Sequence, residues 1–279
     1  MKFYRYFYRL LYPALFVGLS ACVNLQKVND FAVSAGKGAG TYKTLPLSFS
    51  SICQDNCKEQ DIKAGNLNSS KCDCSAERQA DSVDDVFSKT IAGYLSGLDQ
   101  LSADKTTDYQ FDPLDTQLSG LNVPSETAGA CAKLTGILTK AVTDGYRRNK
   151  LKAYICEADP PLQILLKYLR SNVSISLAIK LTASKSKLEG DYVDLLRNSK
   201  ENDYQRRQII QEFYSKTAAI ESQLTQLKAF GALLQTVAAG HRQLADNLDK
   251  FRTADLKSQL SGYARLIGDI RTQIEILRK

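Results

Sequence analysis

The sequence of 279 residues lacks tryptophan and contains one histidine, one methionine and six prolines. A Ser-His-Asp site would have to use the single histidine, His241, and no Gly-x-Ser-x-Gly motif supplies its serine. As a metal ligand, His241 would need companions. Because His241 lies on an apolar helical stripe, we interpret it as a half-buried residue that makes one hydrogen bond. We therefore predict no catalytic residue, no metal site and no cofactor.

Signatures of nucleotide and nucleic-acid binding are also missing. The run Gly36-Lys37-Gly38 has neither the order nor the spacing of a phosphate-binding loop. The net charge is +7, and it falls to about +4 without residues 1–21, which carry three basic and no acidic residues. Lysines and arginines do not gather into a patch, so we predict no nucleic-acid partner.

The one long apolar stretch lies at the start of the chain. Basic residues precede an apolar run from Leu10 to Leu19, which is the layout of a secretory signal. The run ends in Leu19-Ser20-Ala21-Cys22, which resembles the lipobox of bacterial lipoproteins. The resemblance implies that residues 1–21 are a signal peptide and that Cys22 receives lipid after cleavage. The alternative is an uncleaved signal anchor, or a chance cysteine in an ordinary signal.

The resemblance also implies a location. In enteric lipoproteins an aspartate after the lipidated cysteine retains the protein in the inner membrane, and here that position is Val23. We therefore expect an outer-membrane lipoprotein of the cell envelope, with its body in the periplasm or at the cell surface. No later segment approaches the ~18 consecutive apolar residues of a membrane span, so the lipid on Cys22 is the expected contact with the membrane.

Residues 22–50 are interpreted as the lipidated cysteine followed by a flexible tether. The segment is low in charge, and the run from Ser34 to Gly40 consists mostly of glycine and other small residues. Apolar residues at helical spacing near its start, Leu25, Val28, Phe31 and Ala32, predict one short amphipathic turn before the tether.

Six cysteines remain after Cys22, and an even number in an exported chain indicates disulfides. They are Cys53, Cys57, Cys72, Cys74, Cys131 and Cys156. We predict that residues 51–75 form a Cys-rich loop closed by disulfides. A zinc site is the alternative, but a one-residue gap is tight for two ligands of one ion. A bond between Cys72 and Cys74 would be strained, so each of them should reach another cysteine.

The partners of Cys131 and Cys156 depend on Asp144-Gly145, which lies between them. A helical hairpin at this position would set the two cysteines opposite each other. One unbroken helix would hold them about 37 Å apart, and both would then need partners in the Cys-rich loop. We favour the unbroken helix, because only Gly145 interrupts the helical pattern.

Residues 76–279 are predicted to form a helical bundle, because apolar residues recur there at three- and four-residue steps. One helix should end near Asp104, a short helix is predicted after Asp112-Pro113, and Pro124-Ser125-Glu126 should open the next. Asp159-Pro160-Pro161 predicts that one helix ends and another begins. From 173 to 181 the apolar residues alternate at strand spacing, but the stripe on both sides keeps helical phase, which favours a helix.

The spacing of apolar residues in the C-terminal part predicts two long helices, one over 205–251 and one from Leu256 onward. In the second, the apolar residues have the spacing of a coiled coil. Helices this long with narrow apolar stripes must pack on another long helix, from this chain or a second copy. We therefore expect an all-α fold: an elongated helical bundle with long coiled-coil-like C-terminal helices and a disulfide-stapled N-terminal loop.

These features together favour a non-enzymatic envelope lipoprotein. We expect it to bind another protein through its helical faces, as a scaffold, an assembly accessory or a toxin inhibitor, or to associate with itself. Two alternatives remain open. One is a small-ligand receptor or enzyme whose site consists of dispersed carboxylates, because carboxylate pairs need no local motif. The other is a structural spacer between layers of the envelope.

Overall fold

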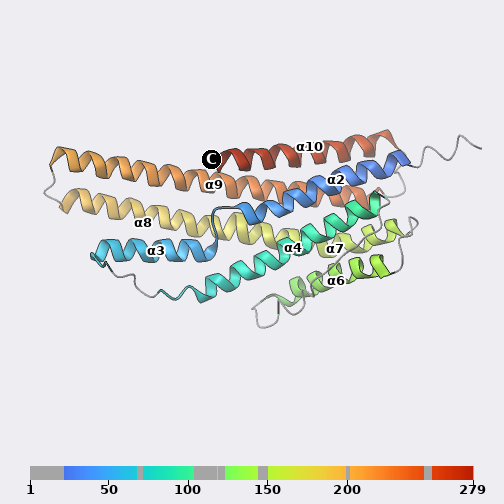
Figure 1. Cartoon of the computed structure of the whole chain (residues 1–279), viewed down its shortest axis with the longest axis horizontal. Coiled ribbons are helices and arrows are strands. Elements are labelled where there is room, and N and C mark those ends of the chain that lie inside the picture. Colours follow the sequence, from blue (N-terminus) through green and yellow to red (C-terminus); the bar gives the residue numbers. More distant parts are fainter. Residues whose placement is uncertain are drawn as a thin grey trace, which may run out of the picture.

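A computed structural model of the chain describes residues 22–67, 72–103, 118, 123–143, 150–198, 202–247 and 253–278. These residues form helices and no strand, which confirms the predicted all-α class. The long helices run roughly along one direction and build an elongated rod (Figure 1). The predicted elongated bundle is thereby confirmed.

The helices follow one another in this order: α2 (Cys22–Gly40), α3 (Phe49–Ala64), α4 (Ser75–Ser102), α6 (Ser125–Thr143), α7 (Leu151–Arg170), α8 (Leu177–Asn198), α9 (Asp203–Asp246) and α10 (Ala254–Leu277). A 3-10 turn, η2 (Thr41–Thr44), follows α2. A π-helical turn, η3 (Ser171–Ser176), joins α7 to α8. The segment from 173 to 181 is therefore helical throughout, as predicted.

The rod has two parts, which we call the core and the arm. The core consists of α2, α4, α6, α7, α10 and residues 226–246 of α9. Within it, α2 packs against α4 and α10, and α7 packs against α6 and α9. Its largest buried side chains include Phe31, Phe87 and Phe230, which are fully inaccessible to solvent. Several helices thus surround one continuous apolar interior.

The arm consists of α3, α8 and residues 203–225 of α9, and it forms the other end of the rod (Figure 1). α8 packs against α9, and α3 packs against α8. The 44-residue α9 is common to both parts. Eleven of its residues from Gln226 to Leu244 are buried, whereas none from 203 to 225 is. The arm half of α9 therefore lacks a surrounding core.

α2 replaces the predicted flexible tether, so that prediction is wrong. Val28, Phe31 and Ala32 begin a buried stripe that continues along the helix instead of ending after one turn. A Cβ at Gly38 would lie 2.9 Å from Ile267 Cγ2 and 3.0 Å from Leu233 Cδ2. The small residues of this segment therefore allow close packing against α9 and α10, and do not provide flexibility.

The predicted Cys-rich loop at 51–75 also needs correction, because most of it is α3. Cys53 and Cys57 lie on this helix, one turn apart, while Cys72 and Cys74 lie on the segment that leads into α4. The sequence of α3 has a weak apolar stripe, since only Phe49, Ile52 and Cys57 are buried apolar residues. A stripe this weak does not indicate a helix from the sequence alone.

α6 and α7 form a helical hairpin, so the predicted unbroken helix is wrong. α6 ends at Thr143, α7 begins at Leu151, and the two helices pack against each other. Their packing buries apolar residues that one extended helix would leave in water. Asp144-Gly145 lies outside the described residues, and so does the short helix predicted after Asp112-Pro113, apart from Leu118.

The helix boundary predicted at Asp159-Pro160-Pro161 is wrong as well, because α7 continues through both prolines. The two prolines cannot donate to the carbonyl groups of Cys156 and Glu157 one turn earlier. Both of these residues are exposed, so water can reach their carbonyl groups. Asp159 does not cap a new helix; its side chain bonds to residues described below.

The long C-terminal helices are close to their predicted positions, with α9 at 203–246 and α10 at 254–277. Asn202 caps α9, because its Oδ1 accepts hydrogen bonds from the backbone N–H groups of Tyr204 (3.1 Å) and Gln205 (3.0 Å). α10 packs against both α9 and α2. The partner that the coiled-coil spacing requires is therefore present within the chain.

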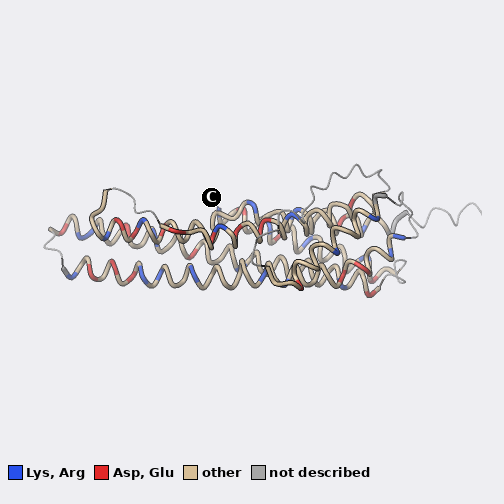
Figure 2. Tube along the Cα trace, turned by 90° about the horizontal axis from the view of Figure 1, so that it is seen from below, with Lys and Arg blue, Asp and Glu red and all other residues tan. Residues whose placement is uncertain are grey.

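Charged residues of both signs are interspersed along the rod (Figure 2). Among the described residues, no helix has the length and hydropathy required to cross a membrane.

Candidate functional site on the disulfide-tied arm

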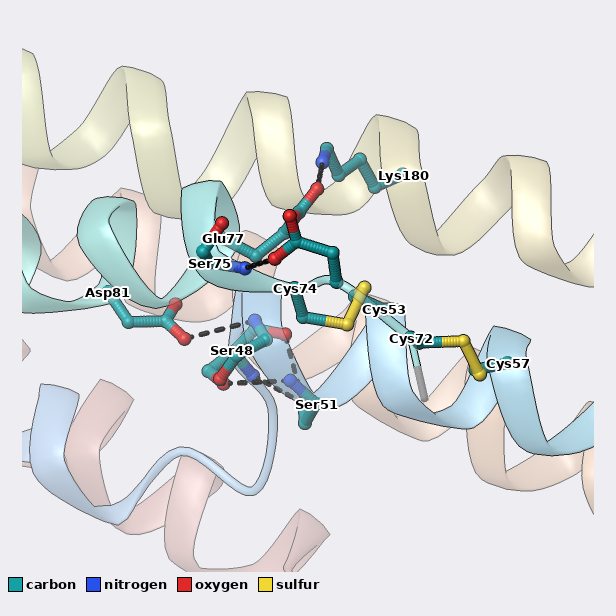
Figure 3. The surroundings of a disulfide bond; sticks show 12 residues. Ser48, Ser51, Cys53, Cys57, Cys72, Cys74, Ser75, Glu77, Asp81 and Lys180 are labelled. Carbon is teal, nitrogen blue, oxygen red and sulfur yellow. Dashed lines mark hydrogen bonds and ion pairs between the residues drawn. A yellow bond between two sulfur atoms is a disulfide. The ribbon is translucent and has the colours of Figure 1, made fainter. Parts of the chain in front are cut away.

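The N-terminus of α3 is fixed to α4 by hydrogen bonds. Ser48 caps the helix: its Oγ accepts from the N–H of Ser51, and its own N–H donates to Ser51 Oγ. Asp81 of α4 accepts from the N–H groups of Phe49 (2.8 Å) and Ser50 (3.0 Å) (Figure 3). A carboxylate here also faces the positive end of the helix dipole. α3 is thereby held at one end by a side chain from a neighbouring helix.

Two disulfides hold α3 farther along. Cys53 bonds to Cys74 and Cys57 bonds to Cys72, with Cα–Cα distances of 6.0 and 6.2 Å (Figure 3). Each cysteine of the pair around Asp73 therefore reaches α3 instead of its neighbour, as predicted. The four sulfur atoms considered for zinc are bonded to one another in pairs. The disulfides join α3 to the start of α4 over sequence separations of 21 and 15 residues.

Ion pairs connect the helices of the arm with one another and with α4. Lys180 of α8 bonds to Glu77 of α4 at 2.9 Å, and this hydrogen bond lowers the pKa of Glu77. Lys63 at the end of α3 bonds to Asp191 of α8, which raises the pKa of Lys63. Because both lysines are exposed and neither carboxylate is buried, each pair contributes little to stability.

Lys216 of α9 is the most connected charge of the arm. It lies 3.0 Å from Glu59 of α3 and 3.1 Å from Glu212, and its ammonium stands over the ring of Tyr192. Burial alone lowers the pKa of Lys216, but the hydrogen bonds to the two glutamates and Tyr192 raise it well above its usual value. The side chain therefore stays charged and links α3, α8 and α9.

Two adjoining hollows form a groove between α3, α8 and α9, which we call the arm groove. One has a volume of about 260 Å³ and reaches Lys216. The other, of about 510 Å³, borders the disulfides. The apolar side chains of the first hollow are Leu47, Ile52, Leu181, Leu188, Ala219 and Ile220. Charged residues, among them Lys58, Lys187 and Asp55, also line it. Such a groove fits an apolar side chain with polar groups around it.

The arm also exposes large apolar side chains. Tyr204 and Tyr214 of α9 are 68% and 67% exposed, and Ile62 of α3 is 59% exposed. Leu195 near the end of α8 is 45% exposed. Aromatic residues of this kind are enriched where proteins bind one another. The arm therefore combines a groove with apolar surface.

The remaining cysteines lie away from the arm groove. Cys22 is the first residue of α2, at the core end of the rod. Cys131 is buried on α6, where its Sγ lies 3.2 Å from Thr90 Oγ1 of α4. Cys156 is exposed on α7. Neither Cys131 nor Cys156 belongs to the two disulfides, so the prediction that both bond to the Cys-rich loop is wrong.

His241 is fully buried and makes two hydrogen bonds, so the prediction of a half-buried residue with one bond is wrong. Its Nε2 lies 2.8 Å from the hydroxyl of Tyr94, and its Nδ1 lies 2.9 Å from Asp159 Oδ1. Asp159 also accepts from Gln163. Burial raises the pKa of Asp159, but the hydrogen bonds to His241 and Gln163 outweigh this and lower it. Burial raises the pKa of Tyr94.

This Tyr94–His241–Asp159 network has the order of a catalytic relay but not its accessibility. The hydroxyl of Tyr94 bonds to the histidine, as the nucleophile of a catalytic triad does, yet Tyr94 is only 2% exposed. A substrate cannot reach it without opening the core. The network therefore satisfies buried polar groups, and it was missed because Tyr94 and Asp159 lie 147 and 82 residues from His241 in the sequence.

Comparison with known proteins gives no match: no family model, no curated protein and no solved structure is significantly similar to this chain. Its function therefore has to be argued from its own residues.

Proposed function

We propose that the chain is a lipid-anchored, non-enzymatic protein of the bacterial cell envelope that binds another protein through the arm. One observation carries the proposal. Among the described residues, the large aromatic side chains that stay exposed, Tyr204 and Tyr214, both lie on the arm and are about two-thirds exposed, whereas the large apolar side chains exposed on the core, Leu266 and Ile276 of α10, are aliphatic. Exposed aromatic residues are typical of protein-binding surfaces.

The position of Cys22 supports this arrangement. α2 begins at the core end of the rod, whereas α8 ends and α9 begins at the opposite end (Figure 1). With 44 residues, α9 alone spans about 66 Å. A lipid on Cys22 would hold the core end at the membrane and leave the arm free of the anchor.

The surface chemistry favours a protein over other partners. The arm carries charges of both signs, and Lys63, Lys180 and Lys216 are already paired with carboxylates. Strong phosphate binding needs a concentration of positive charge, which these ion pairs do not provide. An apolar side chain of a partner entering the arm groove would instead meet Ile52, Leu181 and Leu188.

Photo-crosslinking in cells tests the proposed binding. A photoreactive amino acid is placed at Tyr214 on the arm and, as a matched control, at the exposed Lys133 on α6. We expect Tyr214 to crosslink to another protein, and Lys133 to crosslink to it much less. The proposal fails if the Tyr214 position yields only the chain itself, or if both positions capture the same proteins equally.

The anchor is tested separately with a labelled fatty acid. We expect the label on the full chain and its loss in Cys22→Ser, together with release of the variant from the membrane fraction. Incorporation of label into Cys22→Ser would contradict lipidation at this residue.

A small-ligand receptor is the second candidate function, favoured by the arm groove alone. Asp55, Glu59 and Asp191 lie around its apolar side chains. Ser184→Trp should fill this groove without touching Tyr214. Loss of small-molecule binding with unchanged crosslinking at Tyr214 would favour the receptor.

A further inference from the structure

The two disulfides of the arm differ in their exposure to solvent. We call Cys53–Cys74 the inner disulfide and Cys57–Cys72 the outer disulfide (Figure 3). Cys74 is 1% exposed and Cys53 is only partly exposed, so little solvent reaches the inner bond. Cys72 is exposed, although its partner Cys57 is 8% exposed. A thiolate from outside the molecule can therefore approach the outer disulfide at Cys72, whereas the inner disulfide is shielded.

The outer disulfide holds the part of α3 that has little other packing. Residues 58–64 bury no apolar side chain. Two ion pairs connect this part to its neighbours, Lys63–Asp191 and Glu59–Lys216. All four side chains are at least partly exposed, so each pair contributes little to stability. The docking of this part of α3 therefore depends strongly on the outer disulfide.

The first half of α3 is held by other contacts. Phe49 and Ile52 are buried, Asp81 accepts hydrogen bonds from the N-terminus of the helix, and the inner disulfide joins this half to α4. All of these contacts remain when the outer disulfide is opened. Its loss should therefore loosen residues 57–64 and leave residues 49–56 in place.

The part of α3 that would loosen forms one side of the arm groove. Lys58 and Glu59 line the first hollow, together with Leu188 of α8 and Ile220 of α9. Cys57 lines the second hollow. When this part of α3 moves away, Leu188 and Ile220 become more accessible. Opening of the outer disulfide would therefore enlarge the apolar surface of the arm groove.

We infer that the outer disulfide is a thiol–disulfide exchange site, at which a dithiol loosens α3 beside the arm groove while the inner disulfide stays intact. One thiolate of the dithiol attacks Cys72 Sγ and forms a mixed disulfide, and Cys57 Sγ leaves with the electron pair and takes a proton. The second thiolate then attacks the dithiol's own sulfur in the mixed disulfide, and Cys72 leaves and is protonated. The chain has gained two electrons and two protons, and the dithiol has become a disulfide.

The rates of reduction test the exchange site. The folded full chain is treated with dithiothreitol, and the thiols released at successive times are alkylated and located by mass spectrometry. We expect the outer disulfide to be reduced about tenfold or more faster than the inner one. The same order is expected in Cys131→Ser with Cys156→Ser, because these cysteines belong to neither disulfide. Equal rates, or faster reduction of the inner disulfide, would overturn the inference.

Amide hydrogen exchange of α3 tests the loosening. In one variant both cysteines of the outer disulfide are replaced by serine, and in its matched control both cysteines of the inner disulfide are replaced. We expect loss of the outer disulfide to speed exchange several-fold over 57–64 and to leave 49–56 nearly unchanged, whereas the control should change 57–64 less. Circular dichroism checks that both variants are folded. Unchanged exchange over 57–64, or equal acceleration along all of α3, would contradict the inference.

The exchange reaction and the loosening of α3 do not depend on the proposed function, and only their effect on a bound protein rests on it. Crosslinking from Tyr214 is measured independently of both tests. If Tyr214 captures no partner while the outer disulfide is reduced first and 57–64 loosens, the proposed function fails and the exchange site stands. If Tyr214 captures a partner but the two disulfides are reduced at equal rates, the exchange site fails alone.

Discussion

The two halves of α9 have the same secondary structure but different surroundings. From Gln226 to Leu244 the helix is enclosed by α2, α7 and α10, and its apolar residues are buried. From 203 to 225 it packs mainly on α8, with α3 beside it at Lys216 and the end of α10 at Ser222, and no residue is buried. The comparison shows that α9 is buried only where several helices surround it.

The two parts of the rod are also held together differently. In the core, apolar packing dominates, and the buried His241 bonds both to the buried Tyr94 and to the partly buried Asp159. In the arm, two disulfides, a cap from Asp81 and ion pairs such as Lys216–Glu59 add to a smaller set of buried apolar side chains, among them Ile52 and Leu181. On the arm, apolar residues that packing does not bury remain exposed and can contact a partner.

The largest effect is expected from truncating a core residue of α9. Phe230 is fully buried, so Phe230→Ala should lower the free energy of unfolding by about 4 kcal/mol through lost burial and a cavity. Its arm counterpart Phe213, which stacks against Tyr192 at 5.4 Å, is only partly buried. Phe213→Ala should cost about 1 kcal/mol. Urea unfolding measures both, and equal losses would remove the distinction between core and arm.

Removal of one disulfide should have the next largest effect. Cys57→Ser with Cys72→Ser opens a loop closed over 15 residues, which should lower the free energy of unfolding by about 3 kcal/mol. Thermal and urea unfolding of the double variant measure the loss. Reductant should add a smaller loss in this variant than in the wild-type chain, because one disulfide is already gone. Unchanged stability would show that the arm does not need the bond.

Asp84, near the junction of core and arm, should make stability depend on pH. It is 1% exposed and accepts a hydrogen bond from Asn172 of η3, and burial raises its pKa from 3.8 to about 7. The folded chain therefore holds a proton that the unfolded chain has lost between about pH 4 and 7. This contribution to stability is present at low pH and is lost as the pH rises through about 7.

Asp84→Asn tests this pH dependence directly. The variant should be more stable than wild type at pH 8 by on the order of 2 kcal/mol, and nearly equal to it at pH 4. Urea unfolding at the two pH values gives the difference. The same difference at both pH values would mean that Asp84 titrates normally in the folded chain.

The smallest effect is expected from the charges of the arm. Lys216→Met breaks the bonds to Glu59 and Glu212 and should lower the free energy of unfolding by about 0.5–1 kcal/mol, with a smaller loss at high salt. The exposed Lys228 on the core half of α9 is the control, and Lys228→Met should change little. A loss as large as that of Phe230→Ala would make the ion pairs, not the core, the main source of stability.

Long periodic stripes made α4, α9 and α10 predictable from the sequence, because each buries one face over many turns. The sequence of α2 predicts a flexible tether, because its glycines and alanines are typical of linkers. In the folded chain Gly38 instead lets α2 pack closely against α9 and α10, and these neighbours cannot be read from the segment itself. The even number of cysteines predicted disulfides, but six cysteines allow fifteen pairings and no local rule selects among them.

The candidate site was less predictable than the fold. The arm groove depends on Leu47, Leu188 and Ile220, which come from three distant segments that meet only in the folded chain. The partners of His241 are equally distant in sequence. Spacing along the chain describes one helix at a time, whereas these sites depend on which helices become neighbours.

Amide hydrogen exchange along α9 tests the division into core and arm most directly. The full chain is measured by mass spectrometry with its disulfides intact and after reduction. We predict slow exchange from 226 to 244, faster exchange from 203 to 225, and acceleration on reduction confined to the arm, because local opening follows buried packing. Uniform protection along α9, or acceleration of the core and the arm alike on reduction, would contradict the division.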